Sequence, residues 1–292
     1  MARTLARPTT LAVGVPSRVR ARDRSGIVAH AILVLAVAAV AFPLYYAFVI
    51  STQTLSEVTS LPPRPWPSTA LVSNYAEAWQ RAHMGRLLLN SAIVALGVAF
   101  GKIAISLLSA FAIVYFNFRG KGVVFWMIFV TLMLPVPVRI VSTYQVISVL
   151  GWVNTYWGLT VPLLASATGT FLFRQFYRTI PDSLAEAAEL DGAGPMRFLW
   201  SILLPLSRAN IAALFVILFV YGWNDYLWPL MITTTPEMRT AVIGIESLVP
   251  RTSQLPEWNI AMAAAMMVLL PPVTVIVVMQ RWFVKGLIET EK

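Results

Sequence analysis

The sequence predicts an all-α integral membrane protein with six transmembrane helices, and three observations support this fold class. Hydrophobic residues make up 58% of the 292 residues and charged residues only 12%, about half the charged share of an average soluble domain. Six apolar stretches approach or exceed the roughly 20 residues that cross a bilayer as a helix. The chain has no cysteine and two histidines, so we expect no disulfide and no metal site. These features disfavour a soluble enzyme.

The N-terminal region predicts a basic tail followed by a first membrane span. Six arginines precede the apolar run at residues 27–50. That run is longer than the apolar core of a secretory signal peptide, which has about 7 to 15 residues. We therefore expect residues 1–26 to be a tail and residues 27–292 to form one transmembrane domain.

Five further apolar stretches are predicted to span the membrane. The connection after the first span contains the proline-rich run 61–67, which predicts an extended loop, and a short helix is expected at 74–84. The other expected spans are residues 87–115, 123–141, 158–176, 211–230 and 260–284.

The distribution of basic residues predicts the orientation. Fifteen of the 22 Lys and Arg residues lie in the tail and in alternate connections, and five lie in the remaining connections. An excess of Lys and Arg marks cytoplasmic segments, so both termini are expected in the cytoplasm. The net charge of +9 does not predict nucleic-acid binding, because the basic residues form no stripe with interleaved aromatics.

A polar interruption at residues 177–209 predicts a helix-turn-helix on the inner membrane face. Thr179 or a neighbour can cap a helix that has Pro181 in its first turn, and Gly192 can end it in the left-handed conformation. A second short helix is expected from Pro195 to Pro205.

The first of these two helices has an acidic face and an apolar face. Asp182, Glu186 and Glu189 share one face by their spacing, whereas Leu184, Ala187 and Ala188 share another. Small alanines would permit close approach of a partner. A solvated amphipathic loop helix is the alternative interpretation.

The order of residues in this loop resembles the EAA loop of bacterial ABC importer permeases. The matching residues are Glu186-Ala187-Ala188, Gly192-Ala193, and then Ile202, Leu204 and Pro205, and the spacings between the groups fit the family pattern. The resemblance implies a type I permease fold and a coupling helix, which docks into a cytoplasmic ATPase. It assigns ATPase coupling to Glu186, Ala187, Ala188, Asp191, Gly192 and Ala193.

The resemblance also implies partners and a substrate class. Six spans with both ends inside are similar to carbohydrate-type permeases. Stretches such as Tyr221-Gly222-Trp223-Asn224 and residues 279–284 resemble permeases of sn-glycerol-3-phosphate importers. The expected partners are a second permease subunit, an ATPase dimer that uses ATP and Mg²⁺, an extracytoplasmic substrate-binding protein and membrane lipid. This chain itself has no phosphate-binding GxxxxGK[ST] motif, so no bound cofactor is expected.

Polar residues inside the spans are candidates for the substrate pathway, because ionisable groups there are costly and usually face a cavity or the bundle interior. Lys102 and Arg139 are the two basic residues within apolar runs. Lys102 could instead bond a neighbouring carbonyl, and Arg139 could reach the outer headgroups. Trp223, Asn224, Asp225 and Tyr226 form an aromatic and polar group suited to a polyol, although an interfacial belt would explain the aromatics alone.

The leading interpretation is therefore a permease subunit of an ATP-driven importer in the bacterial cytoplasmic membrane, with sn-glycerol-3-phosphate or a glycerophosphodiester as its substrate. A permease for a neutral sugar or oligosaccharide is one alternative. An integral-membrane lipid-modifying enzyme is another, but it would need clustered catalytic acids or histidines at an interface.

Overall fold

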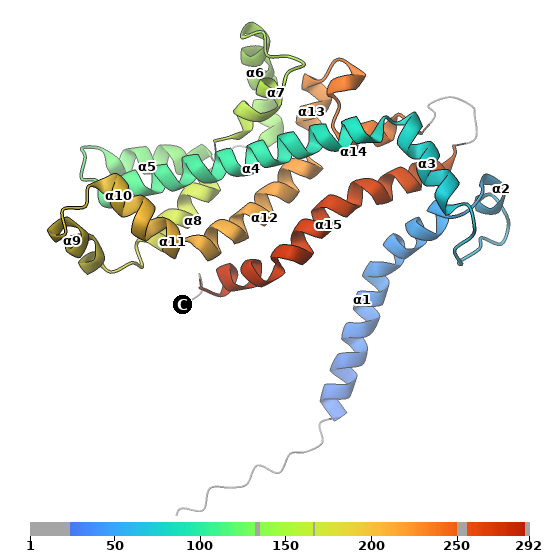
Figure 1. The fold of residues 1–292 in the computed structure, drawn as a ribbon, viewed down its shortest axis with the longest axis horizontal. Helices are drawn as coiled ribbons and strands as arrows, with labels where there is room; N and C mark the ends of the chain where they lie inside the picture. Colours follow the sequence, from blue (N-terminus) through green and yellow to red (C-terminus); the bar gives the residue numbers. More distant parts are fainter. Residues whose placement is uncertain (1–23, 132–134, 166, 250–255, 290–292) are drawn as a thin grey trace, which may run out of the picture. The chain divides into compact units, whose positions relative to one another are not determined.

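A computed structural model describes residues 24–131, 135–165, 167–249 and 256–289, and these residues form helices and no β-strand (Figure 1). Among these described residues, three helices are long and apolar enough to cross a bilayer, and the bent pair of helices Pro195–Leu206 and Arg208–Asn224 would make a fourth span. The three single helices are α1 (Arg24–Ser51), α4 (Met84–Tyr115) and α15 (Trp258–Glu289). They correspond to the first, second and last expected spans, which hydropathy predicts correctly because each is one uninterrupted apolar run.

Contacts divide the chain into two units, residues 1–46 and 47–292. The described part of the first unit is the α1 helix up to Tyr46, where the rings of Phe42 and Tyr46 stack with centroids 6.0 Å apart. The expected tail at residues 1–26 lies almost wholly outside the described residues. The division of the chain at residue 26 stays a prediction.

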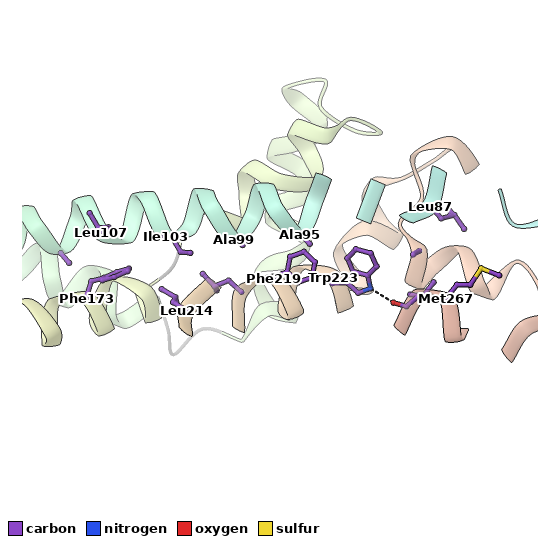
Figure 2. Packing of buried hydrophobic residues seen from close by; sticks show 14 of the residues in the cluster. Leu87, Ala95, Ala99, Ile103, Leu107, Phe173, Leu214, Phe219, Trp223 and Met267 are labelled. Carbon is purple, nitrogen blue, oxygen red and sulfur yellow. Dashed lines mark hydrogen bonds between the residues drawn. The ribbon is translucent and has the colours of Figure 1, made fainter. Parts of the chain in front are cut away.

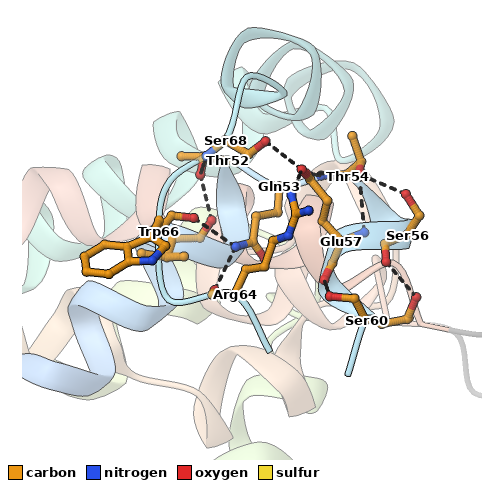
Figure 3. A network of polar contacts seen from close by, with 11 residues as sticks. Thr52, Gln53, Thr54, Ser56, Glu57, Ser60, Arg64, Trp66 and Ser68 are labelled. Atoms are coloured by element: carbon orange, nitrogen blue, oxygen red, sulfur yellow. Dashed lines mark hydrogen bonds and ion pairs between the residues drawn. The ribbon is translucent and has the colours of Figure 1, made fainter. Parts of the chain in front are cut away.

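The connection from α1 to α4 is held by a polar network (Figure 3). It contains the short helix α2 (Leu55–Val58), the non-helical proline-rich run and the helix α3 (Leu71–Arg81), which begins three residues earlier than expected. Thr54 and Glu57 form a capping box on α2, which satisfies backbone donors at its first turn. The amide of Gln53, which is 2% exposed, donates to the carbonyls of Arg64 and Trp66 at 2.9 and 3.0 Å. The proline-rich run is thereby tied to the end of α1.

The third and fourth expected spans are interrupted, which differs from the sequence prediction. The third consists of α5 (Lys121–Val130) and α6 (Val136–Val149), and Pro135 precedes α6 in an extended conformation. The fourth consists of α7 (Tyr156–Thr160), the 3₁₀ turn η2 (Val161–Leu163), which contains Pro162, and α8 (Ala167–Tyr177). Proline lacks the N–H that an unbroken helix needs, so apolar composition alone overestimated their continuity.

The fifth expected span is also divided. The helix α12 (Arg208–Asn224) ends before Asp225, whose backbone is extended, and α13 (Leu227–Ile232) follows. The turn η4 (Pro236–Met238) and α14 (Ala241–Glu246) complete the connection toward α15. The number of membrane crossings therefore stays a prediction for the interrupted segments.

The core forms around α4, which contacts α8 and α12, while α12 also contacts α15. Figure 2 shows buried side chains of these helices meeting along α4, among them Ala95, Ala99, Phe219 and Trp223. Small residues permit the close approach of α4 and α12, because a Cβ added to Gly222 would lie 3.1 Å from Ala95 Cα. Without a hydrophobic driving force inside a bilayer, such close packing is a main source of helix association.

Candidate coupling surface and charged cluster

The predicted acidic helix is present as α9 (Asp182–Leu190), with Pro181 at its N-cap. Asp182 lies in the first turn, where a negative charge interacts favourably with the helix dipole. The proposed cap by Thr179 is not observed; its hydroxyl donates to the Phe176 carbonyl at 2.7 Å. Pro181 alone marks the start of the helix, and no side-chain cap is present.

Gly192 ends the helix as predicted, with φ of +72°. The N–H of Ala193 donates to the Ala188 carbonyl at 2.8 Å, and that of Gly192 donates to the Glu189 carbonyl at 3.0 Å. This pair of bonds is the Schellman motif, in which a left-handed residue satisfies the last carbonyls of a helix. The turn therefore depends on the conformational freedom of glycine at this position.

The two alanines after Glu186 point in different directions, which corrects the predicted apolar face. Ala188 is buried against its own chain at 6% exposure, whereas Ala187 and Leu184 are exposed. Glu186, Glu189 and Asp191 are also exposed. Ala188 therefore attaches α9 to the transmembrane core, and a partner would meet the acidic residues together with Ala187 and Leu184.

The sequence predicted that the helix after Gly192 ends at Pro205. In the structure the helical segment continues past Pro205 to Leu206. It contains α10 (Pro195–Phe198), the π-helical turn η3 (Leu199–Leu203) and α11 (Leu204–Leu206). The change of direction comes at Ser207, and the helices before and after it make an angle of 74°. Pro205 is the second residue of α11, which directly follows the π-helical turn, and the helical run continues to Leu206.

Aromatic side chains join this loop to the ends of α4 and α8. The Tyr115 ring packs edge-on against the Phe198 ring with centroids 5.2 Å apart, and it lies 6.1 Å from the Tyr177 ring. Phe198 and Tyr177 are buried. A displacement of α9 and α10 would therefore be resisted by the packed ends of α4 and α8. Figure 1 shows α9 and α10 beyond one end of α4, with α3 beyond the other.

A second candidate site surrounds Lys102, which is 9% exposed in α4. Its Nζ lies 4.5 Å from the centre of the Tyr221 ring of α12. A cation over an aromatic face is stabilised by about 0.5 to 2 kcal/mol, more when it is desolvated. The contact with the aromatic ring therefore offsets part of the free energy that burying this ammonium group costs.

Two of the other predicted pathway residues lie close to Lys102. Both Asp225 and Arg139 interact electrostatically with it, and both also interact with Tyr221. The Asp225 carboxylate accepts hydrogen bonds from the backbone N–H groups of Trp228 and Tyr226. These bonds stabilise the non-helical connection between α12 and α13. The cluster of Lys102, Arg139, Asp225 and Tyr221 thus joins three separate segments and carries one excess positive charge.

The remaining predicted pathway residues, Trp223, Tyr226 and Asn224, differ in how far they are buried. Trp223 is 2% exposed, and its indole N–H donates to the Val268 carbonyl at 3.1 Å (Figure 2). It packs in the core of this chain, and its assignment to the pathway stays a prediction. Tyr226 is half-buried with its hydroxyl 3.3 Å from a Glu246 carboxylate oxygen, and Asn224 is exposed.

Sequence reasoning missed Tyr221 as a member of the cluster. On the uninterrupted helix that the sequence predicted, its position four residues before Asp225 would place the two side chains on the same face; in the structure Asp225 directly follows the end of α12. That spacing, read together with the lone Lys102, is the signal that would have found it.

A protein-family model and several named relatives indicate the same class of membrane transport protein. Residues 102–289 match the family model described as "Binding-protein-dependent transport system inner membrane component". The chain is similar to proteins named "sn-glycerol-3-phosphate transport system permease protein UgpE". The one from Agrobacterium fabrum is 54% identical over 278 residues, which cover 93% of this chain and 99% of the relative. The one from Yersinia enterocolitica is 50% identical over 272 residues, with 91% and 97% covered.

A solved structure shares the fold. It is described as a bacterial ABC transporter involved in the import of the acidic polysaccharide alginate, and its matched chain is 19% identical with a TM-score of 0.81. The match covers 92% of this chain and 100% of that chain. Both candidate sites lie within the residues that the family model matches.

Proposed function

This chain belongs to the family of binding-protein-dependent transport system inner membrane components, and we propose from this premise that it is a permease subunit of an importer for sn-glycerol-3-phosphate. The observation that carries the substrate assignment is the identity of 50–54% to UgpE proteins along nearly the full length of both chains. The all-α fold is that of type I ABC importer permeases.

The chain is a non-catalytic transport subunit and a multi-pass protein of the inner membrane. The family and the named relatives displace the alternative of a lipid-modifying enzyme. The main interpretation also holds over a permease for a neutral sugar. A binding-protein-dependent importer has other subunits, so the function of this chain has to be understood within a complex.

The charged cluster supports passage of an anion. Lys102 and Arg139 supply two positive charges against the single negative charge of Asp225. A phosphate that enters a region of low dielectric needs compensating charge, because an unpaired ion there costs several kcal/mol even after relaxation. We assign phosphate contacts to Lys102 and Arg139, and contacts with glycerol hydroxyls to Asn224, Asp225 and Tyr226.

The exposed face of α9 supports docking to an ATPase. Glu186, Glu189, Asp191 and Ala187 are exposed there, while Ala188 packs inward and the Gly192 turn sets the direction of the chain. Closure of the ATPase would move α9 and α10, and the aromatic contacts of Phe198 and Tyr115 would pass that movement to α4. Because Lys102 lies on α4, the movement would reach the charged cluster.

The proposed complex contains this chain, a second permease subunit, an ATPase dimer and an extracytoplasmic substrate-binding protein, all in contact with membrane lipid where they are embedded. ATP and Mg²⁺ would bind to the ATPase and not to this chain, and no nucleic acid takes part. Both termini would lie in the cytoplasm, because basic residues concentrate on that side of the predicted spans. The α9 end of the molecule would then face the cytoplasm.

Uptake by vesicles that contain the whole complex tests this function. ATP-driven uptake of labelled sn-glycerol-3-phosphate, glycerophosphocholine and maltose would be compared, with ATP omitted as the control. We expect uptake of sn-glycerol-3-phosphate that requires both ATP and the binding protein. Uptake of maltose alone would overturn the substrate assignment, and preferential uptake of glycerophosphocholine would assign a diester instead.

A further inference from the structure

A hollow of about 630 Å³ lies between α4, α5 and α8 at the end of the molecule that carries α9. Its basic lining residues are Lys121, Arg174 and Arg178, and its one acidic residue is Asp182. A smaller hollow of about 410 Å³ shares Arg174 and Arg178 with it. The two arginines therefore separate two adjoining depressions on one surface.

Within the described part of the chain, the three basic side chains take part in no ion pair. Among the residues that the structure describes, the ion pairs are Arg64–Glu57, Arg81–Glu77 and Arg81–Glu257, and none involves the hollow. The Arg174 guanidinium lies 4.1 Å from the centre of the Phe125 ring, which restrains it at the wall. With Asp182 counted, the hollow keeps an excess of two positive charges for a ligand.

The rest of the wall consists mainly of apolar side chains, together with Tyr177 and Gly122. Ile113 and Val114 of α4, Phe125 and Trp126 of α5, and Ile180 before α9 line the same space. Trp126 is 61% exposed, and exposed tryptophan is typical of the interface between lipid tails and headgroups. A ligand that fits must combine a negative group with apolar chains.

We propose that this hollow binds the headgroup of an anionic phospholipid from the inner leaflet. The phosphate would contact Lys121, Arg174 and Arg178, and the first part of the acyl chains would lie along the apolar wall. Basic pockets between transmembrane helices on the cytoplasmic side have the chemistry that such headgroups require. A free phosphate would use the charges but not the apolar wall. The leaflet rests on the orientation given in the proposed function.

The hollow lies between the transmembrane helices and the start of α9. Its wall joins α5 and α8 to Asp182, the first residue of α9. A lipid bound there would bridge the transmembrane helices and the start of the proposed coupling helix.

The test measures lipid retained by the purified full complex, without ATP or transport substrate, by native mass spectrometry. Phosphatidylglycerol and zwitterionic phosphatidylcholine would be supplied separately. The variant is Lys121→Gln/Arg174→Gln/Arg178→Gln. Its matched control, Arg119→Gln/Arg197→Gln/Arg208→Gln, removes three exposed basic residues outside the hollow. Co-purification of the partner subunits would check that each variant assembles.

We expect the first variant to bind phosphatidylglycerol at least about tenfold more weakly, since it removes the three positive charges that attract the anionic headgroup. The control variant should retain the lipid, as should Arg174→Lys/Arg178→Lys. Equal retention by the two neutralised variants would overturn the proposal, as would equal binding of phosphatidylcholine or displacement of the lipid by inorganic phosphate. Failure of the uptake assay with lipid retention intact would affect only the proposed transport function.

Discussion

The ammonium group of Lys102 lies 4.5 Å from the centre of the Tyr221 ring, which links α4 to α12 at the point where the charged residues gather. Asp225, the first residue after α12, also interacts electrostatically with Lys102, so the end of α12 places a ring and a carboxylate near the same cation. The pair connects the packing of the core to the proposed transport pathway.

Replacing Lys102 by methionine is expected to reduce ATP-driven uptake of sn-glycerol-3-phosphate at least about tenfold, the effect of roughly 1.4 kcal/mol on a barrier. The methionine keeps the volume but removes the charge that would compensate the phosphate. Uptake by vesicles with the full complex is the measurement, and Lys102→Arg should preserve most of it. Unchanged uptake in Lys102→Met would remove the residue from the pathway.

Tyr221 provides a separate test of the same cluster. Tyr221→Phe should retain uptake, because the ring face that contacts Lys102 remains. Tyr221→Leu should lower uptake several-fold, since a leucine has no aromatic face to stabilise the cation. Initial uptake rates at matched protein levels would distinguish them, and equal rates for the two variants would show that the cation–ring contact has no role in transport.

Gly192→Ala is expected to weaken coupling between transport and ATP hydrolysis. A non-glycine residue in the left-handed conformation costs about 1 to 2 kcal/mol, which opposes the turn that ends α9. Gly194→Ala is a matched control, because its φ is −67° and neither glycine has an atom within 4 Å of an added Cβ. Substrate-stimulated ATP hydrolysis should fall several-fold only in Gly192→Ala. An equal effect of both changes would contradict this account.

Glu186→Lys should release the ATPase from the permease while leaving the fold intact, because Glu186 is exposed on α9. The change reverses the charge of the acidic face that we propose meets the ATPase. The amount of ATPase that co-purifies with the permeases is the measurement. Glu186→Gln should have a smaller effect, and full ATPase recovery with Glu186→Lys would argue against docking at this face.

Gly222→Val should destabilise the contact between α12 and α4. An added Cβ would lie 3.1 Å from Ala95 Cα, and forcing atoms into a packed core costs about 1 to 3 kcal/mol. The unfolding midpoint in detergent should therefore fall. Gly122→Val places the same side chain in open space and should change the midpoint little. Similar losses in both variants would indicate that close packing at Gly222 is unimportant.

The network around Glu57 is expected to loosen in acid. A backbone hydrogen bond from Thr54, followed by one from the Ser68 hydroxyl, lowers the pKa of Glu57 below its ordinary value of 4.5. A lowered folded-state pKa means that this carboxylate adds stability above pH 4.5 and loses it as the pH falls toward the folded-state pKa. Amide exchange in residues 54–68 should accelerate in that window, and Glu57→Gln should abolish the added pH dependence. Identical pH profiles of amide exchange for the unmodified protein and Glu57→Gln would refute the stabilising role of the Glu57 carboxylate.

The sequence alone determined the features that depend on local chemistry or on bilayer thickness. Continuous apolar runs predicted α1, α4 and α15, because a bilayer requires a long apolar helix. Pro181 and Gly192 predicted the bounds of α9, because proline favours a helix start and glycine tolerates the left-handed end. The EAA pattern indicated the family because its residues lie close together in the chain and can be recognised without the tertiary structure.

Only the tertiary structure decided which faces of these helices are occupied by the chain itself. Ala187 and Ala188 are chemically alike, yet Ala188 is buried and Ala187 is exposed. Trp223 fits a polyol site by type but packs in the core, whereas Tyr221 meets Lys102 from another helix. Side-chain type and spacing define a helical face, but contacts between segments far apart in the sequence, such as Trp223 with Val268 and Tyr221 with Lys102, determine what that face meets.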